Sequence, residues 1–270
     1  MNIDKIKSTL FQALRAAGRI IKAGSQKQFT IRKKGELNLV TVYDLAAEKA
    51  ILSIIKKNFP DHSILTEESK PSGNSSSRWI IDPLDGTTNF AHGFPAACTS
   101  IAFEEKGKVI LGGVYDPFRK ELFFAQKGKG AFLNGKKIRV SKTPKLSEAL
   151  VCTGFPYDRK QHMDEYMPIF RDFKMNVQGL RRMGAAALDL CYVACGRFDG
   201  YWELKLQPWD KAAGMLMIAE AGGKLTDFSG NPLTLTGLQN LVSNRLIHAD
   251  MLSVIKPYRN TAISKQFDGD

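Results

Sequence analysis

Two carboxylates lie close together in the segment Trp79–Phe90, which reads W-I-I-D-P-L-D-G-T-T-N-F. An apolar run brings Asp82 to the end of a predicted strand, and Pro83 then bends the chain so that Asp85 falls close to it. Two such carboxylates repel each other and are costly to hold together unless a cation lies between them. The spacing therefore predicts that Asp82 and Asp85 share a metal ion.

The residues that follow predict an anion site beside this metal site. Gly86 allows a ligand to approach the backbone closely, and Thr87 opens a short predicted helix whose first N–H groups can bind a phosphate. In an alternative interpretation, Asp85 only caps this helix and Thr87 is only its opening hydroxyl. The alternative does not explain Asp82, which ends an apolar strand and has no helix to cap.

Two further acidic positions support a metal site. Glu67 and Glu68 follow the apolar run Ser63–Leu65, and Asp210 precedes a predicted helix over Ala212–Ala221. Alone, the glutamate pair is typical of a solvated loop, and Asp210 is typical of a helix N-cap that can also orient a ligand. Because the set contains only oxygen ligands, without His or Cys, it suits a hard cation such as Mg²⁺.

These segments together resemble the inositol monophosphatase family. Besides Trp79–Phe90, the resemblance rests on P-W-D-x-A-A-G over Pro208–Gly214, on E-A-G-G over Glu220–Gly223, and on the pair Glu67 and Glu68. These motifs stand in the family's order and at its spacings. The resemblance implies a mixed α+β fold, the layered α-β-α-β-α sandwich of inositol monophosphatases and fructose-1,6-bisphosphatases. It also implies a homodimer that uses Mg²⁺ and is sensitive to Li⁺.

The resemblance further implies which groups hold the metal. The Glu67 and Asp82 carboxylates and the Leu84 carbonyl are expected to bind a first Mg²⁺. Asp82, Asp85 and Asp210 are expected to bind a second ion. Because Glu67 is also expected at a weaker third position, the site would hold two to three ions.

The expected catalytic residues are Thr87, Asp44 and Glu67, by the same resemblance. Thr87, supported by Asp44, would orient the attacking water. The backbone N–H groups of Gly86 and Thr87 would hold the phosphate, which Asp85 would also contact.

On the other side of the expected pocket, Gly184, Ala185, Ala186 and Glu203 match positions that contact the hydroxyl groups of a sugar or cyclitol. One family hydroxyl is missing, because the family has Gly-Thr-Ala or Gly-Ser-Ala here. Glu203 could instead be an ordinary surface acid. Lys33 matches a basic position near the metals. No aromatic platform for a nucleotide base is evident, so we expect a small phosphorylated polyol or sugar as the substrate.

We therefore expect a phosphomonoesterase that hydrolyses inositol monophosphate by direct in-line attack of a metal-activated water. A serine-bearing segment of the animal enzymes has no match in Cys152–Tyr157, and Arg181 with Arg182 resembles the bacterial branch. These departures leave the substrate open. The alternatives within the fold are fructose-1,6-bisphosphate, histidinol phosphate, 3′-phosphoadenosine 5′-phosphate and NADP.

The net charge of +12 raises a second class of function, because a positive protein can bind nucleic acid. The basic residues are scattered, however, and no zinc-finger or RNA-binding signature is present. A solvated basic surface explains the charge without a partner. The alternative is an additional role on RNA or on a transcription complex, which the bacterial-branch resemblance brings into consideration.

The chain of 270 residues with 43% hydrophobic content is long enough for one large domain with a sizeable core. A composition shift near position 146 predicts an α+β half over 1–146 and an α/β half over 147–270. No run approaches the roughly 20 apolar residues of a membrane helix, and the first residues form an amphipathic helix rather than a signal peptide. The four cysteines form no C-x-x-C pair, so we expect buried, reduced thiols in a cytoplasmic protein.

Hydrophobic periodicity and turn residues predict the secondary structure. Strands are expected at Gln28–Lys33, Asp61–Leu65, Trp79–Asp82, Ala97–Glu104, Val109–Asp116, Glu121–Gln126, Gly130–Asn134, Leu150–Thr153, Val177–Leu180, Gly200–Leu204 and Leu241–Val242. Helices are expected at Met1–Gly24, Tyr43–Asn58, Met163–Phe170, Met183–Cys195, Ala212–Ala221 and Ala249–Ile255. The strands of the middle region, from Ala97 to Asn134, are expected to be antiparallel.

Overall fold

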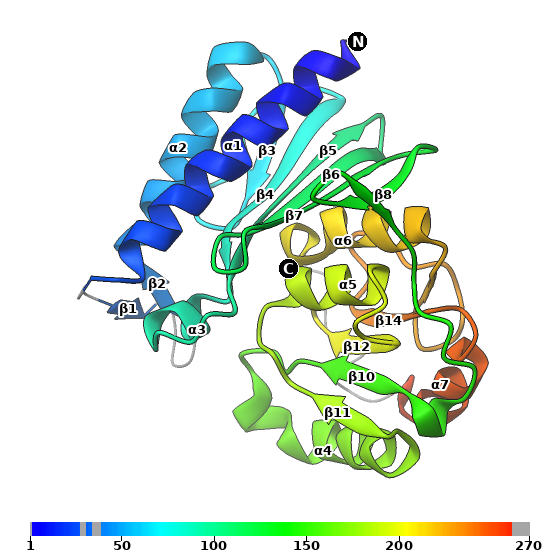
Figure 1. The fold of residues 1–270 in the computed structure, drawn as a ribbon. Coiled ribbons are helices and arrows are strands. Elements are labelled where there is room, and N and C mark those ends of the chain that lie inside the picture. The colour runs from blue at the N-terminus through cyan, green and yellow to red at the C-terminus, as the bar shows by residue number, and fades with distance from the viewer. Residues whose placement is uncertain (1, 28–30, 34–38, 261–270) are drawn as a thin grey trace.

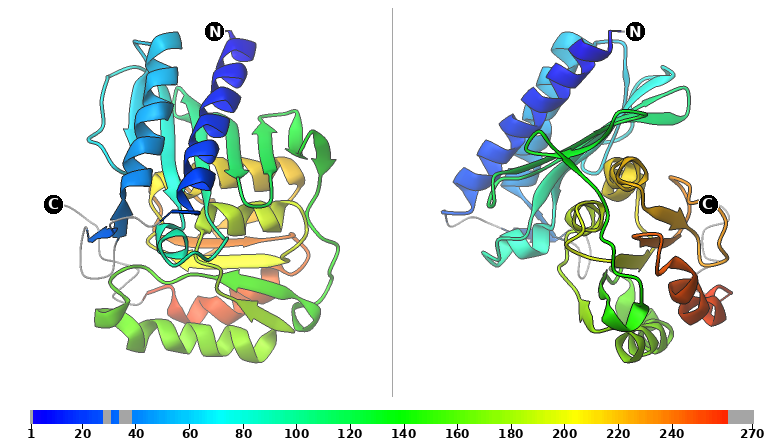
Figure 2. Two further views of the ribbon diagram at one scale, coloured as in Figure 1. Left: turned by 60° about the vertical axis from the view of Figure 1, so that its left-hand side comes forward. Right: turned by 45° about the vertical axis from the view of Figure 1, so that its right-hand side comes forward.

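The computed structural model describes residues 2–27, 31–33 and 39–260, with side chains everywhere in these ranges except at positions 31–33 and 159. Five layers alternate between helices and sheets (Figures 1 and 2). The described α-helices are α1 (Ile3–Gly24), α2 (Val42–Asn58), α3 (Thr87–Ala91), α4 (Arg159–Asn176), α5 (Ala186–Ala194), α6 (Pro208–Ala221) and α7 (His248–Ile255). The layered mixed α and β fold expected from the sequence is confirmed.

The larger sheet has seven strands in the order β3-β4-β5-β6-β7-β8-β9. They are β3 (Ser63–Thr66), β4 (Ser77–Asp85), β5 (Cys98–Glu105), β6 (Lys108–Asp116), β7 (Glu121–Gln126), β8 (Gly130–Leu133) and β9 (Lys136–Ile138). Each neighbouring pair is antiparallel except β3 and β4, which are parallel. This parallel pair brings the ends of β3 and β4 to the same edge of the sheet.

The smaller sheet has five strands in the order β11-β10-β12-β14-β13. They are β10 (Leu150–Thr153), β11 (Gly179–Arg181), β12 (Gly200–Leu204), β13 (Lys224–Thr226) and β14 (Gln239–Ser243). Strand β10 is parallel to both neighbours, whereas β14 is antiparallel to both of its own. A separate two-stranded sheet pairs β1 (Ile31–Lys33) with β2 (Leu39–Thr41).

Helices α1 and α2 cover the outer face of the larger sheet (Figure 1). Ile6, Leu10 and Leu14 recur at helical spacing on α1 and are buried in one cluster with Trp79 and Phe103 of the sheet. Burial of a side chain of this size contributes about 1.5–3 kcal/mol. The amphipathic first helix therefore holds the larger sheet from outside.

Helices α5 and α6 form the layer between the two sheets (Figure 2). Every residue of α5 from Ala187 to Ala194 is buried, because sheets lie on both sides of this layer. The cluster around α5 contains Phe123 of the larger sheet and Val242 of the smaller one. A helix that is buried on all sides is the type expected in such a middle layer.

Helices α4 and α7 cover the other face of the smaller sheet. Phe173 of α4 stacks on Trp202 of β12 with ring centroids 5.3 Å apart, and Met251 of α7 belongs to the same buried cluster. Within the described residues, no helix is both long and apolar enough to cross a lipid bilayer.

Several predicted boundaries were wrong for local reasons. Helix α5 starts at Ala186 rather than Met183, because Gly184 has a positive φ of 84° and Ala185 is extended. Helix α6 starts at Pro208 rather than Ala212, because proline is well suited to the first turn of a helix. Helix α4 is longer than expected, and the short strands β9 and β13 were not predicted. Of the strand predicted over 28–33, residues 28–30 lie outside the described residues.

Candidate active site

A cavity of about 610 Å³ lies where strand ends of both sheets meet the starts of α3, α5 and α6. It is lined by most of the predicted site residues: Glu67, Asp82, Leu84, Asp85, Gly86, Thr87, Gly184, Ala185, Ala186, Glu203 and Asp210. Asp44 does not line the cavity but lies directly behind Thr87. The side chain of Lys33 lies outside the described residues, so its predicted position near the metals stays a prediction.

A β-bulge brings Asp82 and Asp85 to the same side of the larger sheet. In a regular strand, residues three apart point to opposite faces. Here Asp82 pairs with Ser100 and Asp85 with Cys98, so three steps on β4 match two on β5. Pro83 lies inside this bulge, where its missing N–H breaks no ladder bond. The bulge therefore aims both carboxylates into the cavity.

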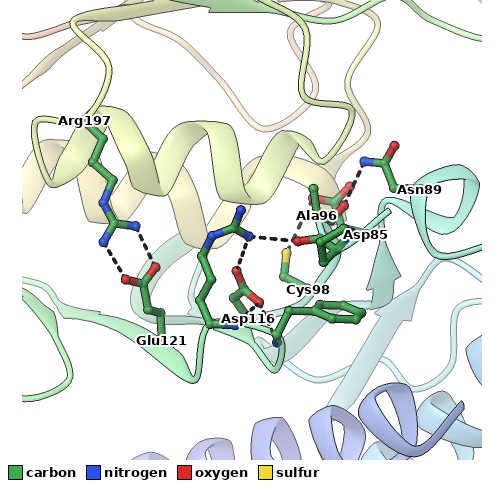
Figure 3. Close-up of polar contacts among 10 residues, drawn as sticks. Asp85, Asn89, Ala96, Cys98, Asp116, Glu121 and Arg197 are labelled. Atoms are coloured by element: carbon green, nitrogen blue, oxygen red, sulfur yellow. Dashed lines mark hydrogen bonds and ion pairs between the residues drawn. The ribbon is translucent and has the colours of Figure 1, made fainter. Parts of the chain in front are cut away.

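The Asp85 carboxylate connects the larger sheet to the middle helix layer. Its Oδ2 accepts a hydrogen bond from the N–H of Ala187, 2.7 Å away, in the first turn of α5. The Cys98 thiol lies 3.6 Å from the same oxygen (Figure 3). Ala185 has no side chain that could cap α5, so Asp85 supplies the acceptor from a distant part of the chain. The alternative in which Asp85 caps the helix after it is wrong, since Gly86 is the N-cap of α3.

Glu67 and Glu68 take different directions after β3. Glu67 follows the parallel β3–β4 pair, where its N–H donates to the Ile81 carbonyl at 3.3 Å, and it lines the cavity beside Asp82. Glu68 does not line the cavity, and its N–H donates to the buried Glu48 carboxylate at 3.2 Å. Of the pair, only Glu67 lies in the candidate site.

Asp210 lies in the first turn of α6 and faces the cavity. Its Oδ2 accepts from the Gln207 N–H at 2.7 Å in a capping box. The interpretation of Asp210 as an N-cap is therefore wrong, because the N-cap is Gln207 and Asp210 is three residues further on. The helix start still fixes this side chain in place.

The cavity concentrates negative charge in a protein whose net charge is +12. Burial and then the charge of Glu67 and Asp85 raise the pKa of Asp82 well above its usual range. Burial and then Asp85 raise the pKa of Asp210 in the same way, and burial raises the pKa of Asp85 to about 6. Like charges held together in this way favour either protonation or the binding of a cation.

The donor set fits a hard divalent cation. All of the candidate ligands are carboxylate or carbonyl oxygens, which Mg²⁺ prefers. Within the described ranges, no three acidic, histidine or cysteine side chains are gathered closely enough to enclose an ion by themselves. The expected ligands Asp82, Asp85 and Asp210 would therefore have to draw closer together to hold an ion.

The Thr87 hydroxyl lies between two acceptors at the start of α3. Its Oγ1 is 2.8 Å from Asp44 Oδ1 and 2.9 Å from the Leu84 carbonyl oxygen. Asp44 is fully buried, and its other oxygen accepts from the N–H and hydroxyl of Thr41 in a capping box. Burial raises the pKa of Asp44, and the hydrogen bonds from Thr41 and Thr87 oppose this. The Thr87 hydroxyl thus contacts Asp44 as expected, and its role toward a water stays a prediction.

Glu203 is a buried acid on the far wall of the cavity, so its interpretation as a surface acid is wrong. The hydroxyl of the buried Tyr201 donates to its Oε2. Burial raises the pKa of Glu203 to about 7. Behind it lies the buried Asp189, which has no described hydrogen-bond partner other than the weakly polar Cys152 thiol. Burial and then Glu203 raise the pKa of Asp189 well above its usual range.

An aromatic wall corrects the expectation that no platform for a base exists. Phe155, Tyr157 and Trp209 all line the cavity, and the Tyr157 side chain is half exposed. Burial of the Tyr157 hydroxyl and then the charge of Glu67 and Asp85 raise its pKa, so the hydroxyl stays protonated. The sequence motif around Cys152–Tyr157 contained two of these rings, but the fold was needed to direct them inward.

Other polar residues at the site were also not predicted. Asn89 follows the cavity-lining Thr87 and Thr88 and donates to the backbone carbonyls of Ala96 and Met183. The fully buried Lys211 follows Asp210, and its Nζ donates to the Gly237 carbonyl and to Asn240 Oδ1. The sequence pointed to Asn89 and Lys211 only through their places in the motifs Trp79–Phe90 and Pro208–Gly214. Their hydrogen-bond partners lie outside these motifs.

Comparison with known proteins agrees with the family resemblance of the sequence motifs. Residues 2–260 match the model of the inositol monophosphatase family. An inositol-1-monophosphatase from Synechocystis sp. is 46% identical over 243 residues, which cover 89% of this chain and 85% of that protein. A protein named Nus factor SuhB from Pasteurella multocida is 41% identical over 91% of this chain and 94% of its own length.

The fold is also similar to that of a solved structure. The extragenic suppressor protein suhB from Bartonella henselae superposes with a TM-score of 0.89 at 39% identity, over 93% of this chain and 98% of that one. The fold and the acid-lined cavity, taken with these relatives, define a phosphatase. The chain belongs to the inositol monophosphatase family.

Proposed function

We propose that the protein is a Mg²⁺-dependent phosphatase that hydrolyses inositol monophosphate by direct attack of water. The observation that carries the proposal is a single cavity with acids and a helix start on one wall and a buried hydroxyl acceptor, Glu203, on the other. The first wall suits a phosphate with its metal ions, and the second suits a polyol ring.

The metal would be held by oxygen atoms already in the cavity wall. Glu67, Asp82 and the Leu84 carbonyl would bind one ion, and Asp82, Asp85 and Asp210 a second, with Glu67 available for a weaker third. When bound, Mg²⁺ supplies positive charge for the phosphoryl oxygens and lowers the pKa of a bound water.

The chain's own groups would position the water and the phosphate. Because Asp44 and the Leu84 carbonyl fix the Thr87 hydroxyl, its oxygen is available to orient a water in the cavity. The N–H groups of Gly86 and Thr87, at the start of α3, would hold phosphate oxygens. No covalent intermediate is required, since displacement by a positioned water needs only orientation and charge stabilisation.

The ring of the substrate would lie against the second wall. The Glu203 carboxylate, held by the Tyr201 hydroxyl, would accept a hydrogen bond from a ring hydroxyl. Gly184, Ala185 and Ala186 leave room beside it because their side chains are small. Binding would therefore be weaker for a monoester without a hydroxyl at this position.

A panel of phosphate esters tests the substrate. We expect phosphate release from inositol 1-phosphate to have the highest kcat/KM and to stop when EDTA removes Mg²⁺, and we expect added Li⁺ to inhibit it. The panel also contains fructose-1,6-bisphosphate, histidinol phosphate, 3′-phosphoadenosine 5′-phosphate and NADP. Fastest turnover of one of these would replace the substrate, whereas full activity in EDTA would refute the metal-dependent chemistry.

Asp82→Asn tests the metal ligands. Mutation of residues that only support metal ligands costs about 10–100-fold, so removal of a shared ligand charge should lower kcat by more than about 100-fold. Thermal stability should hold or rise, because a buried like-charge contact is relieved. Asp250→Asn, at an exposed position on α7, is the matched control. Near-normal turnover of Asp82→Asn at saturating Mg²⁺ would contradict the proposal.

A second candidate function is binding to RNA or to a transcription complex. It is supported by the name of the relative from Pasteurella multocida and by the net charge of +12. Retention of the purified protein on an RNA of defined sequence, with affinity falling steeply as salt increases, would support it. Asp82→Asn should leave this binding intact. No retention at low salt would refute RNA binding.

The cytoplasmic location, the homodimer and the single domain with halves at 1–146 and 147–270 remain proposals. A mass of two chains in light scattering would support the homodimer, and a mass of one chain would refute it.

A further inference from the structure

One side chain, Asn89, joins helix α3 to the turn that precedes α5. Its Nδ2 lies 2.8 Å from the Ala96 carbonyl, 2.8 Å from the Met183 carbonyl and 3.2 Å from the Gly184 carbonyl. Figure 3 shows Asn89 directed at Ala96, close to Asp85. All three partners are acceptors, which identifies the amide nitrogen as the atom that faces them.

The partners come from distant parts of the chain. Asn89 belongs to α3, which opens with the expected phosphate seat, whereas Met183 and Gly184 precede α5 on the wall that would bind ring hydroxyls. These two contacts span 94 and 95 residues of sequence. The amide thus fixes the position of one wall relative to the other.

Close packing leaves little freedom at this junction. A Cβ on Gly86 would lie 2.7 Å from the Ala96 carbonyl oxygen and 3.2 Å from the Ala185 Cβ. A Cβ on Gly184 would lie 2.3 Å from Arg182 Nη1 and 3.2 Å from Asn89 Nδ2. The turn carrying Gly184 is therefore pressed against the start of α3, and the hydrogen bonds of Asn89 hold it there.

We propose that Asn89 is a positioning residue that aligns the ring-binding wall with the phosphate seat. It need not touch the substrate, because it acts through the backbone of Met183 and Gly184. This inference rests on the proposed recognition of a ring hydroxyl by the second wall. Misplacement of a positioning group by about 1 Å can cost about 100-fold in rate.

Asn89→Asp tests the proposal with a nearly isosteric change. The aspartate has the same shape, but as an anion it donates no hydrogen bond and repels the carbonyl oxygens. Two substrates distinguish the contribution of the ring-binding wall from that of the phosphate seat. Inositol 1-phosphate has ring hydroxyls, whereas the nitrophenyl group of 4-nitrophenyl phosphate has none. We expect kcat/KM to fall about 10–100-fold for the first and no more than about threefold for the second.

Asn58→Asp is the matched control. Asn58 is also partly buried, and its amide also donates to a backbone carbonyl, that of Ile54 at 2.9 Å, but this carbonyl belongs to its own helix α2 and no residue of α2 lines the cavity. We expect both substrates to be hydrolysed normally by this variant. An equal loss on both substrates in Asn89→Asp, or no loss on either, would overturn the proposal.

Hydrogen–deuterium exchange gives a readout that does not depend on the substrate. In Asn89→Asp, we expect faster exchange in the segment 183–187 and unchanged exchange in α1. Unchanged exchange in 183–187 would overturn the role of Asn89 even if the natural substrate is another ester. Failure of the wild-type enzyme to hydrolyse inositol 1-phosphate would instead refute the proposed substrate alone.

Discussion

The Thr87 hydroxyl is held by hydrogen bonds to two acceptors of the candidate site. Two acceptors, Asp44 Oδ1 and the Leu84 carbonyl, compete for its single proton. Whichever of them receives the proton, the hydroxyl oxygen keeps a lone pair that can accept from a water. Asp44 is buried by the capping box with Thr41, so the whole arrangement is held before any substrate arrives.

Thr87→Val should therefore remove the hydroxyl without disturbing the fold. Valine keeps the branched shape but cannot bind Asp44 or a water, so we expect kcat to fall at least about 100-fold, which is the usual contribution of a positioned proton-transfer group. Thr87→Ser keeps the hydroxyl and should retain activity within about tenfold. Steady-state kinetics on both variants check this expectation. Equal losses in both would contradict the expectation, because they would show that the hydroxyl alone does not account for the role of Thr87.

Tyr157 bears on the choice of substrate in another way. Its half-exposed ring offers an apolar face at the cavity, together with Phe155 and Trp209. Aromatic contacts of this kind contribute about 0.5–1.5 kcal/mol, which corresponds to a factor of up to about ten. Tyr157→Ala should therefore raise KM for 4-nitrophenyl phosphate by about two- to tenfold and leave KM for glycerol 2-phosphate unchanged. Tyr157→Phe should behave as the wild type. The idea is wrong if both esters respond alike.

At the scale of the element, α6 serves two purposes with consecutive residues. Asp210 turns toward the cavity, whereas Lys211 is fully buried and binds the turn near Gly237 and Asn240. Asn240 in turn donates to the Glu203 carbonyl at 3.1 Å. The start of one helix is thus connected to both a candidate metal ligand and the strand of the ring-binding acid.

Lys211→Met should reveal the energetic role of this connection. The ammonium is desolvated, and burial lowers its pKa to about 8. Its loss would leave the Gly237 carbonyl and the Asn240 amide oxygen without this partner, so we expect a destabilisation of about 1–3 kcal/mol in urea unfolding. Lys224→Met, at an exposed position on β13, should change stability by less than about 0.5 kcal/mol. A fully stable Lys211→Met would show that methionine packing replaces the ammonium.

Local sequence signals predicted the elements better than the contacts between them. The apolar run before Asp82 predicted a strand there, although β4 continues to Asp85, and Glu67 was placed in the site only with the help of the family resemblance. The bond from Ala187 to Asp85 spans 102 residues and depends on a bulge, so no local pattern could predict it. The inward direction of Tyr157 and the carbonyl partners of Asn89 depend on the same meeting of distant segments.

At the scale of the whole molecule, the negative cavity makes stability depend on pH. Burial raises the pKa of Asp85 to about 6 and that of Glu203 to about 7, from ordinary values of 3.8 and 4.5. At a pH between the ordinary and the raised pKa of each group, the unfolded chain has lost the proton that the folded protein still binds. The stabilisation from these two groups is therefore complete below about pH 4 and is lost as the pH rises through 6 to 7.

Unfolding of the metal-free protein in urea at several pH values tests this sign. Each group should contribute on the order of 3 kcal/mol to the difference between pH 4 and pH 8. In Glu203→Gln, the part due to Glu203 should disappear, so the pH dependence should become flatter. Added Mg²⁺ should raise stability more at pH 8 than at pH 5, because the carboxylates are then charged. A wild-type stability that falls no more steeply than that of Glu203→Gln would contradict the expectation.

The middle helix α5 restricts how this molecule could be divided or recombined. Both sheets pack against it, so cutting the chain between Ile138 and Leu150 would expose a broad apolar surface on each fragment. Such fragments would aggregate rather than act as independent modules. A chimaera that exchanges one half with a relative would need to graft the matching faces of α5 and of the larger sheet together.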